Sequence, residues 1–142
     1  MILVDANLLL YAVKSDLPQH AKARGWWEDI LSGDQIIGLP WVVIPAFVRL
    51  TTNTRVFEQP LSVERACAYI EEWLSLPGAR IVVPGEGHWP IFHNLLVQCG
   101  AGGNLTTDAH IAALALEYGY TVYSSDHDFG RFPGLRHVNP LL

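Results

Sequence analysis

A chain of 142 residues, half of them apolar, is long enough to bury a core of its own, so we expect residues 1–142 to form one domain. No apolar run reaches the roughly 20 residues of a membrane helix, and Met1–Asp5 lacks the basic flank of a signal peptide, which predicts a cytoplasmic protein with no membrane span. The formal net charge of −5 argues against non-specific capture of nucleic acid, which needs many lysine and arginine contacts, but it does not exclude a phosphate substrate held through a metal ion.

The N-terminal half alternates apolar runs with helical patterns. In chain order we expect a strand over residues 2–6, a helix over 20–32, a strand over 36–39 and a helix over 41–53. Asn7–Tyr11 and a polar loop through Pro18 separate the first strand from the first helix. Gly33 is placed to end that helix in the left-handed conformation, and Pro45 fits the first turn of the next helix, where its missing N–H costs nothing.

The C-terminal half continues the alternation. We expect a helix over residues 62–75, a strand over 81–83, a helix over 89–98, a helix ending at Gly119, a strand over 121–124 and a last strand over 137–139. Ser62 is expected to cap the first of these helices, and Thr106 or Thr107 the third. Cys67 and Cys99 lie in apolar helical stretches with no C-x-x-C spacing, so we expect two buried free thiols.

This alternation predicts an α/β fold. Parallel strands joined by right-handed helical crossovers form a mainly parallel central sheet with helices on both faces. In such sheets, ligands bind at the edge where the strands end.

Three aspartates are placed at that edge. Asp5 ends the first strand, Asp126 follows the strand over 121–124, and Asp108 opens the helix before it. Gathered carboxylates repel one another by roughly 4 kcal/mol per pair at about 4 Å and an effective dielectric constant near 20, so cations or protons must neutralise them. Oxygen ligands without clustered Cys or His suit Mg²⁺ or Mn²⁺, which polarise phosphate groups and activate water. The predicted reaction is hydrolysis of a phosphodiester.

Each aspartate also has a purely structural explanation. Asp108 suits a helix N-terminus, and Asp126 and Asp128 suit turn positions. Asp5 differs, because it interrupts an apolar strand and is costly to bury without a partner or a metal. The metal site therefore rests on the occurrence of all these residues at one edge.

Two polar residues beside the aspartates are candidates for substrate binding. Asn7 is placed to orient Asp5 or a water, and Ser124 to donate a hydrogen bond to Asp126 or to a phosphate. Turn chemistry explains both equally well. His110 and His127 also neighbour the aspartates, but a hydrogen-bonded or exposed role is commoner for such histidines than a ligand role.

Five segments occur in an order that is typical of one family. They are Leu3–Asn7, Phe47–Leu50, Thr107–Gly119, Ser125–Phe129 and Pro140–Leu141. In this set, which spans nearly the whole chain, the sequence resembles the PIN-domain ribonucleases, most closely the VapC-type toxins of bacterial toxin–antitoxin pairs.

The resemblance implies a three-layer α/β/α sandwich, an Mg²⁺- or Mn²⁺-dependent endoribonuclease acting on structured RNA such as tRNA or rRNA, a cognate antitoxin and a homodimer. Asp5, Asp108 and Asp126 match the metal-binding positions of the family, with Asp128 as a fourth member of the catalytic group. By this resemblance Asp5 and Asp126 hold metal directly, Asp108 binds metal or a metal water, and Asp128 orients water. Four arginines could grip an RNA backbone, namely Arg49, Arg55, Arg131 and Arg136. We favour Arg49, which lies in an otherwise apolar helical stretch, whereas an ordinary solvated surface position explains the other three.

Two other enzyme and signalling families are excluded because each requires a side chain that this chain lacks. A haloacid-dehalogenase phosphatase needs an aspartate where this chain has Asn7, and a receiver domain needs a late lysine, whereas the only lysines are Lys14 and Lys22. A degenerate PIN domain that binds protein or RNA without cutting stays open, because family members commonly carry a glutamate where this chain has Ala46. Either Asp128, a water or a nearby acid replaces that glutamate, or metal affinity is lower and the substrate completes the site.

Replacing Ala46 tests this departure from the family pattern. We expect Ala46→Glu to tighten Mg²⁺ binding, because it restores an acidic oxygen ligand. Isothermal calorimetry of parent and variant measures the change. Unchanged affinity would show that position 46 does not face the metal.

Overall fold

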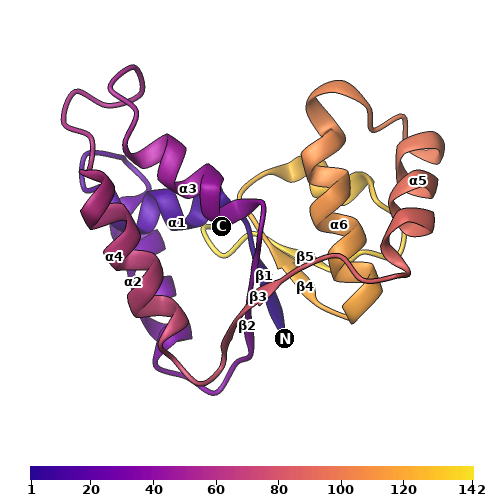
Figure 1. The fold of residues 1–142 in the computed structure, drawn as a ribbon, viewed down its shortest axis with the longest axis horizontal. Helices are drawn as coiled ribbons and strands as arrows, with labels where there is room; N and C mark the ends of the chain where they lie inside the picture. The colour runs from indigo at the N-terminus through magenta and orange to yellow at the C-terminus, as the bar shows by residue number, and fades with distance from the viewer.

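The computed structural model describes residues 1–142 (Figure 1). Its strands are β1 (Ile2–Val4), β2 (Ile37–Pro40), β3 (Ala79–Val82), β4 (Thr121–Tyr123) and β5 (His137–Val138). Its α-helices are α1 (Ala6–Val13), α2 (His20–Leu31), α3 (Val43–Thr51), α4 (Val63–Leu74), α5 (His88–Gln98) and α6 (Thr106–Tyr118). Two short 3₁₀ helices, η1 (Gly103–Leu105) and η2 (His127–Arg131), complete the elements. None of the helices is both long enough and apolar enough to cross a membrane.

The strands form one sheet in the order β3-β2-β1-β4-β5, and every neighbouring pair is parallel. The chain moves outward from β1 to β2 and β3 and then returns to place β4 on the other side of β1. The strand order therefore reverses between β1 and β4, and ligands of open α/β sheets bind at such a switch point.

Helices cover both faces of this sheet (Figure 1). Helix α1 packs on α2 and α3, and α3 packs on α4, whereas α5 packs on α6 at the opposite side. The predicted α/β/α sandwich with a parallel central sheet is thus confirmed. The core between the layers includes the fully buried side chains of Phe47, Phe129, Leu3, Leu8, Leu39, Ile111 and Leu114.

Several predicted helix boundaries are confirmed by their local chemistry. Ser62 Oγ accepts a hydrogen bond from the Arg65 N–H at 3.1 Å and so caps α4. Pro45 lies in the first turn of α3. Gly119 ends α6 with φ of 78°, a left-handed conformation that costs glycine nothing.

Helix α1 was not expected from the sequence. The first strand ends at Val4 rather than at residue 6, and Asp5 caps a helix that begins at Ala6. This helix contains the consecutive apolar residues Leu8, Leu9 and Leu10, because it packs on both α2 and α3. A helix buried on several sides has no amphipathic period to reveal it.

Other local predictions were wrong. Gly33 does not adopt the left-handed conformation: α2 ends at Leu31, and the chain leaves it in a turn in which the Gly33 N–H donates to the Ile30 carbonyl at 3.2 Å. Neither Thr106 nor Thr107 caps α6, since η1 leads directly into the helix and Leu105 holds the capping position without a side-chain bond. The cysteines are free as expected, but Cys67 is exposed, and Cys99 is only half-buried where it packs against the core.

Gly38 in β2 is required by packing. A Cβ at this position would lie 2.8 Å from Val82 Cγ2 and 2.9 Å from Leu3 Cδ1. We expect Gly38→Ala to lower the free energy of unfolding by about 1–3 kcal/mol, because the crowded side chains belong to packed neighbouring strands. The matched control is Gly25→Ala in α2, where a Cβ meets nothing within 4 Å and helix propensity predicts a gain of about 0.5–1 kcal/mol. Urea denaturation of both variants measures the difference, and equal effects would contradict it.

Candidate metal centre

The pairing of β1 with β4 positions the first part of the site. Their register aligns Val4 with Tyr123, and the Asp5 N–H donates to the Tyr123 carbonyl at 3.0 Å. Asp5 and Ser124 therefore leave the two strands side by side at the switch point.

The position of α6 adds Asp108. This helix leads into β4 and runs opposite to it, so its N-terminal turn lies at the edge where the strands end. Asp108 is in that first turn. The right-handed crossover thus brings a residue 103 positions away in sequence to the edge occupied by Asp5.

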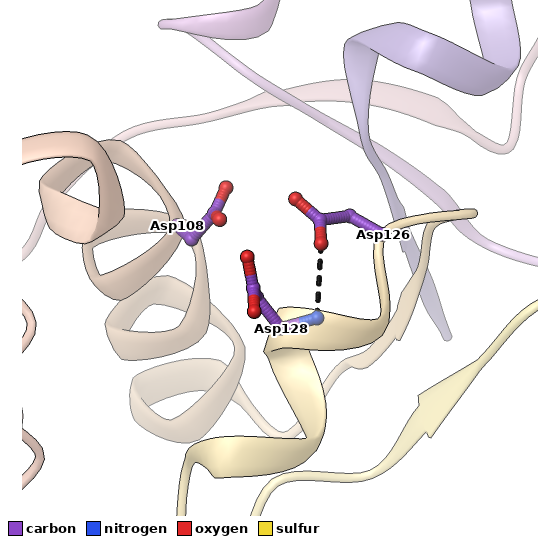
Figure 2. A group of neighbouring side chains, drawn as sticks. All are labelled: Asp108, Asp126 and Asp128. Atoms are coloured by element: carbon purple, nitrogen blue, oxygen red, sulfur yellow. Dashed lines mark hydrogen bonds between the residues drawn. The ribbon is translucent and has the colours of Figure 1, made fainter.

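A local turn places the last two aspartates. Asp126 Oδ1 accepts a hydrogen bond from the Asp128 N–H at 2.9 Å and caps η2 (Figure 2). The turn chemistry that explains these residues structurally is therefore present, and it is also what folds Asp128 back beside Asp126.

Asp108, Asp126 and Asp128 form one acidic group. Each offers a carboxylate oxygen, and these oxygens lie within 4.8 Å of one another. Figure 2 shows the three side chains directed toward a common space between α6 and η2. All three residues are half-buried, so the group is open to solvent on one side.

Asp5 lies beside this group rather than in it. Its Oδ1 accepts from the Ala6 N–H at 2.8 Å, and its Oδ2 accepts from Ser124 Oγ at 2.7 Å. Asp5 is close enough to Asp108 and Asp126 for its charge to raise the pKa of Asp108 and for the charge of Asp126 to raise the pKa of Asp5. The structure thus gathers all four predicted aspartates, three in direct proximity and one held by protein hydrogen bonds.

Ser124 connects the parts of the site. Its fully buried hydroxyl donates to Asp5 and accepts from the Asp126 N–H at 3.0 Å and from Asn7 Nδ2 at 3.2 Å. One proton and two lone pairs are all that a hydroxyl offers, so this bridge uses the whole capacity of Ser124. Asn7, in the first turn of α1, keeps a buried Oδ1 without a hydrogen-bond partner.

Within the acidic group only Asp128 has a salt bridge to an arginine or lysine, the one to Arg131. Burial, together with the charges of Asp126 and Asp5, raises the pKa of Asp108 to about 7. Burial also raises the pKa of Asp5, although the hydrogen bonds from Ser124 and Ala6 act in the opposite direction. A divalent cation would relieve this repulsion, and a donor set made only of carboxylate oxygens fits Mg²⁺ or Mn²⁺. The chain's own residues therefore fit the predicted metal.

Of the positively charged and imidazole residues considered for the site, two contact Asp128 and the others do not. Arg131 Nε lies 3.3 Å and His127 Nε2 3.8 Å from Asp128 Oδ1. His110 instead pairs with His88, at 3.0 Å between Nδ1 and Nε2, in the interface between α5 and α6. Arg49 is exposed on α3 and takes part in no salt bridge.

Sequence patterns did not reveal two contacts of this region. His88 Nδ1 lies 3.7 Å from Glu117 Oε1, so His88 joins α5 to both His110 and the end of α6. His137 on β5 lies 3.1 Å from the Ser124 carbonyl oxygen. Neither contact has a local sequence signal, since each joins residues from separate elements.

A model of the PIN domain matches residues 2–135 of the chain. The chain belongs to the PIN-domain family. Ribonuclease VapC33 of Mycobacterium tuberculosis is 43% identical to this PIN domain over 141 residues, which make up 99% of each chain. The resemblance carried by the five sequence segments is thereby confirmed.

Solved structures share the fold of this PIN domain. Mycobacterium tuberculosis VapC20, described as a sarcin–ricin loop cleaving toxin, superposes with a TM-score of 0.72 at 18% identity, covering 99% of this chain and all of that one. VapBC2 from Rickettsia felis, bound to a DNA fragment from its promoter, superposes with a TM-score of 0.67 at 19% identity, covering 98% of each chain. At these identities the likeness supports the fold alone.

The raised pKa of Asp108 predicts a pH-dependent stability of the metal-free PIN domain. The folded-state pKa of about 7 lies above the ordinary value of 3.8, so the folded chain binds the extra proton and its stability falls as pH rises from about 4 through 7. We expect Asp108→Asn to exceed the parent in Tm by about 3 °C or more at pH 8 in EDTA, and by less at pH 5. Differential scanning fluorimetry measures both. An equal difference at the two pH values would show that Asp108 ionises as an ordinary carboxyl group.

Proposed function

We propose that this PIN domain is a metal-dependent endoribonuclease, the toxin of a toxin–antitoxin pair, and that it hydrolyses phosphodiester bonds in structured RNA, either tRNA or rRNA. The observation that carries the proposal is the acidic group of Asp108, Asp126 and Asp128 with Asp5 beside it. It lies at the ligand-binding edge of a chain that is 43% identical, over its whole length, to a protein named as a ribonuclease.

Asp5, Asp108 and Asp126 are the residues that would hold Mg²⁺ or Mn²⁺. When bound, the cation supplies charge neutralisation and Lewis acidity at the scissile phosphate. Ser124 fixes the orientation of Asp5 and of the backbone that carries Asp126. Asp128 would orient the attacking water.

The proposed partners follow from the relatives. The named relatives are ribonucleases of the VapC type, and one solved neighbour is a VapBC assembly. These relatives support our proposal of a cognate antitoxin for this chain. A homodimer and a cytoplasmic place of action are proposed from the family resemblance. The proposed target is the class of structured RNA, tRNA or rRNA, and no cleavage sequence, because the chemistry of the acidic group recognises phosphate and not base sequence.

A PIN domain that binds without cutting is the second candidate, and Ala46 favours it. Ala46 is half-buried in α3 and packs against the hydrophobic core. Its methyl group has no oxygen to offer a metal, whereas the family commonly has a glutamate at this position. The four retained aspartates favour catalysis, because a binding module has no physical reason to bear a repulsion that raises the pKa of Asp108 to about 7.

Cleavage of RNA with and without metal separates the two candidates. We expect the parent to cut structured RNA in Mn²⁺ and not in EDTA, and Asp5→Asn to cut about 100-fold or more slowly, because it keeps the shape of Asp5 but removes its charge. Gel analysis of labelled tRNA and rRNA fragments measures the rates.

Asp34→Asn is the matched control for this experiment. Asp34 is exposed in the connection between α2 and β2, at the opposite edge of the sheet, so the same change of charge should leave cleavage unaltered. Equal rates for parent and Asp5→Asn would refute the proposed mechanism.

A further inference from the structure

One arginine lies at the rim of the acidic group. Arg131, the last residue of η2, places Nε 3.3 Å from Asp128 Oδ1, three residues back in the chain. The arginine side chain is 57% exposed, whereas that of Asp128 is 27% exposed. The guanidinium therefore sits between the acidic group and solvent.

Most of the hydrogen-bonding capacity of Arg131 is unused. A guanidinium has five N–H donors in a planar fork that matches two oxygens of a phosphate. Arg131 has only the one contact with Asp128, and His127, which approaches the same oxygen at 3.8 Å, has at most two donors. The fork is held near the site by one carboxylate and remains free to bind an anion.

The other arginines with assigned contacts lie elsewhere. Arg24 pairs with Glu28 on α2, and Arg65 contacts Tyr69 on α4. Arg136 donates to the Gly119 carbonyl, at the end of α6 that is opposite to Asp108. Arg131 is the only arginine or lysine in salt-bridge contact with the acidic group.

The position of Arg131 beside the aspartates matters for the binding of a negatively charged substrate. An RNA phosphate that approaches four aspartates meets repulsion, and a single divalent cation offsets two of those charges. We propose that Arg131 binds a phosphate of the RNA next to the scissile bond, and that Asp128 holds the guanidinium in place for it. The proposal rests on the proposed function of the site and assigns to Arg131 the backbone contact that the sequence suggested for Arg49.

The salt dependence of RNA binding tests the proposal directly. The probe is a fluorescein-labelled single-stranded RNA of mixed sequence, titrated in Mn²⁺ with the cleavage-deficient Asp5→Asn protein over a range of KCl concentrations. We expect Arg131→Ala to weaken binding about tenfold and to reduce the slope of log K against log salt by about 0.7, the value for one lost phosphate contact on a single strand. Arg131→Lys should restore the slope, because it keeps the charge, but only part of the affinity, because it loses the fork.

Arg136→Ala is the matched control, with the same change of net charge at the far end of α6. Its slope and affinity should equal those of the parent. If Arg131→Ala and Arg136→Ala have the same slope, Arg131 contacts no phosphate and the proposal is overturned.

A second comparison distinguishes a phosphate contact of Arg131 from a role in which Arg131 only positions the Asp128 side chain. In an Asp128→Asn background the ion pair is absent, so a supporting role predicts that Arg131→Ala has no further effect on binding. A phosphate contact predicts that the slope still falls. Binding is measured in a protein that does not cleave, so the two proposals can fail separately. If the parent protein does not cleave RNA, the proposed function is wrong. If Arg131→Ala leaves the salt slope of binding unchanged, the proposed role of Arg131 is wrong.

Discussion

The parallel pairing of β1 with β4 is the constraint on which the site depends. It sets Asp5 beside Ser124 at the point where the strand order reverses, and a single buried hydroxyl then joins both strand ends. The helix that enters β4 must start at the same edge, which adds Asp108. The backbone topology, more than side-chain packing, therefore holds these mutually repelling carboxylates close together.

The repulsion is balanced differently at each aspartate. Asp5 is held by two hydrogen bonds, whereas burial and three neighbouring carboxylates raise the pKa of Asp108 to about 7. Asp128 has an arginine and a histidine at one oxygen. The site thus has one part in which Asp5 is fixed by hydrogen bonds and another in which Asp128 contacts the exposed side chains of Arg131 and His127.

The sequence predicted the positions of the aspartates because each lies at the end or start of an element, and the order of elements fixes the edge of the sheet. It failed where the outcome depends on which elements pack together. Helix α1 was missed because its apolar residues pack on both α2 and α3, and the pairing of His88 with His110 joins helices whose contact has no local pattern. The sequence offered Arg131 only as one of four arginines and did not place it beside the aspartates, since only the folded η2 brings its guanidinium to Asp128.

Two of the aspartates also organise the backbone. Asp5 caps α1 and Asp126 caps η2, so replacing either side chain by a non-polar one disturbs a helix start as well as the chemistry. A side chain at position 46 lies within α3, past its first three residues, and caps nothing. A substitution at position 46 therefore leaves every helix start intact, whereas a non-polar replacement of Asp5 or Asp126 removes a capping hydrogen bond together with a carboxylate of the site.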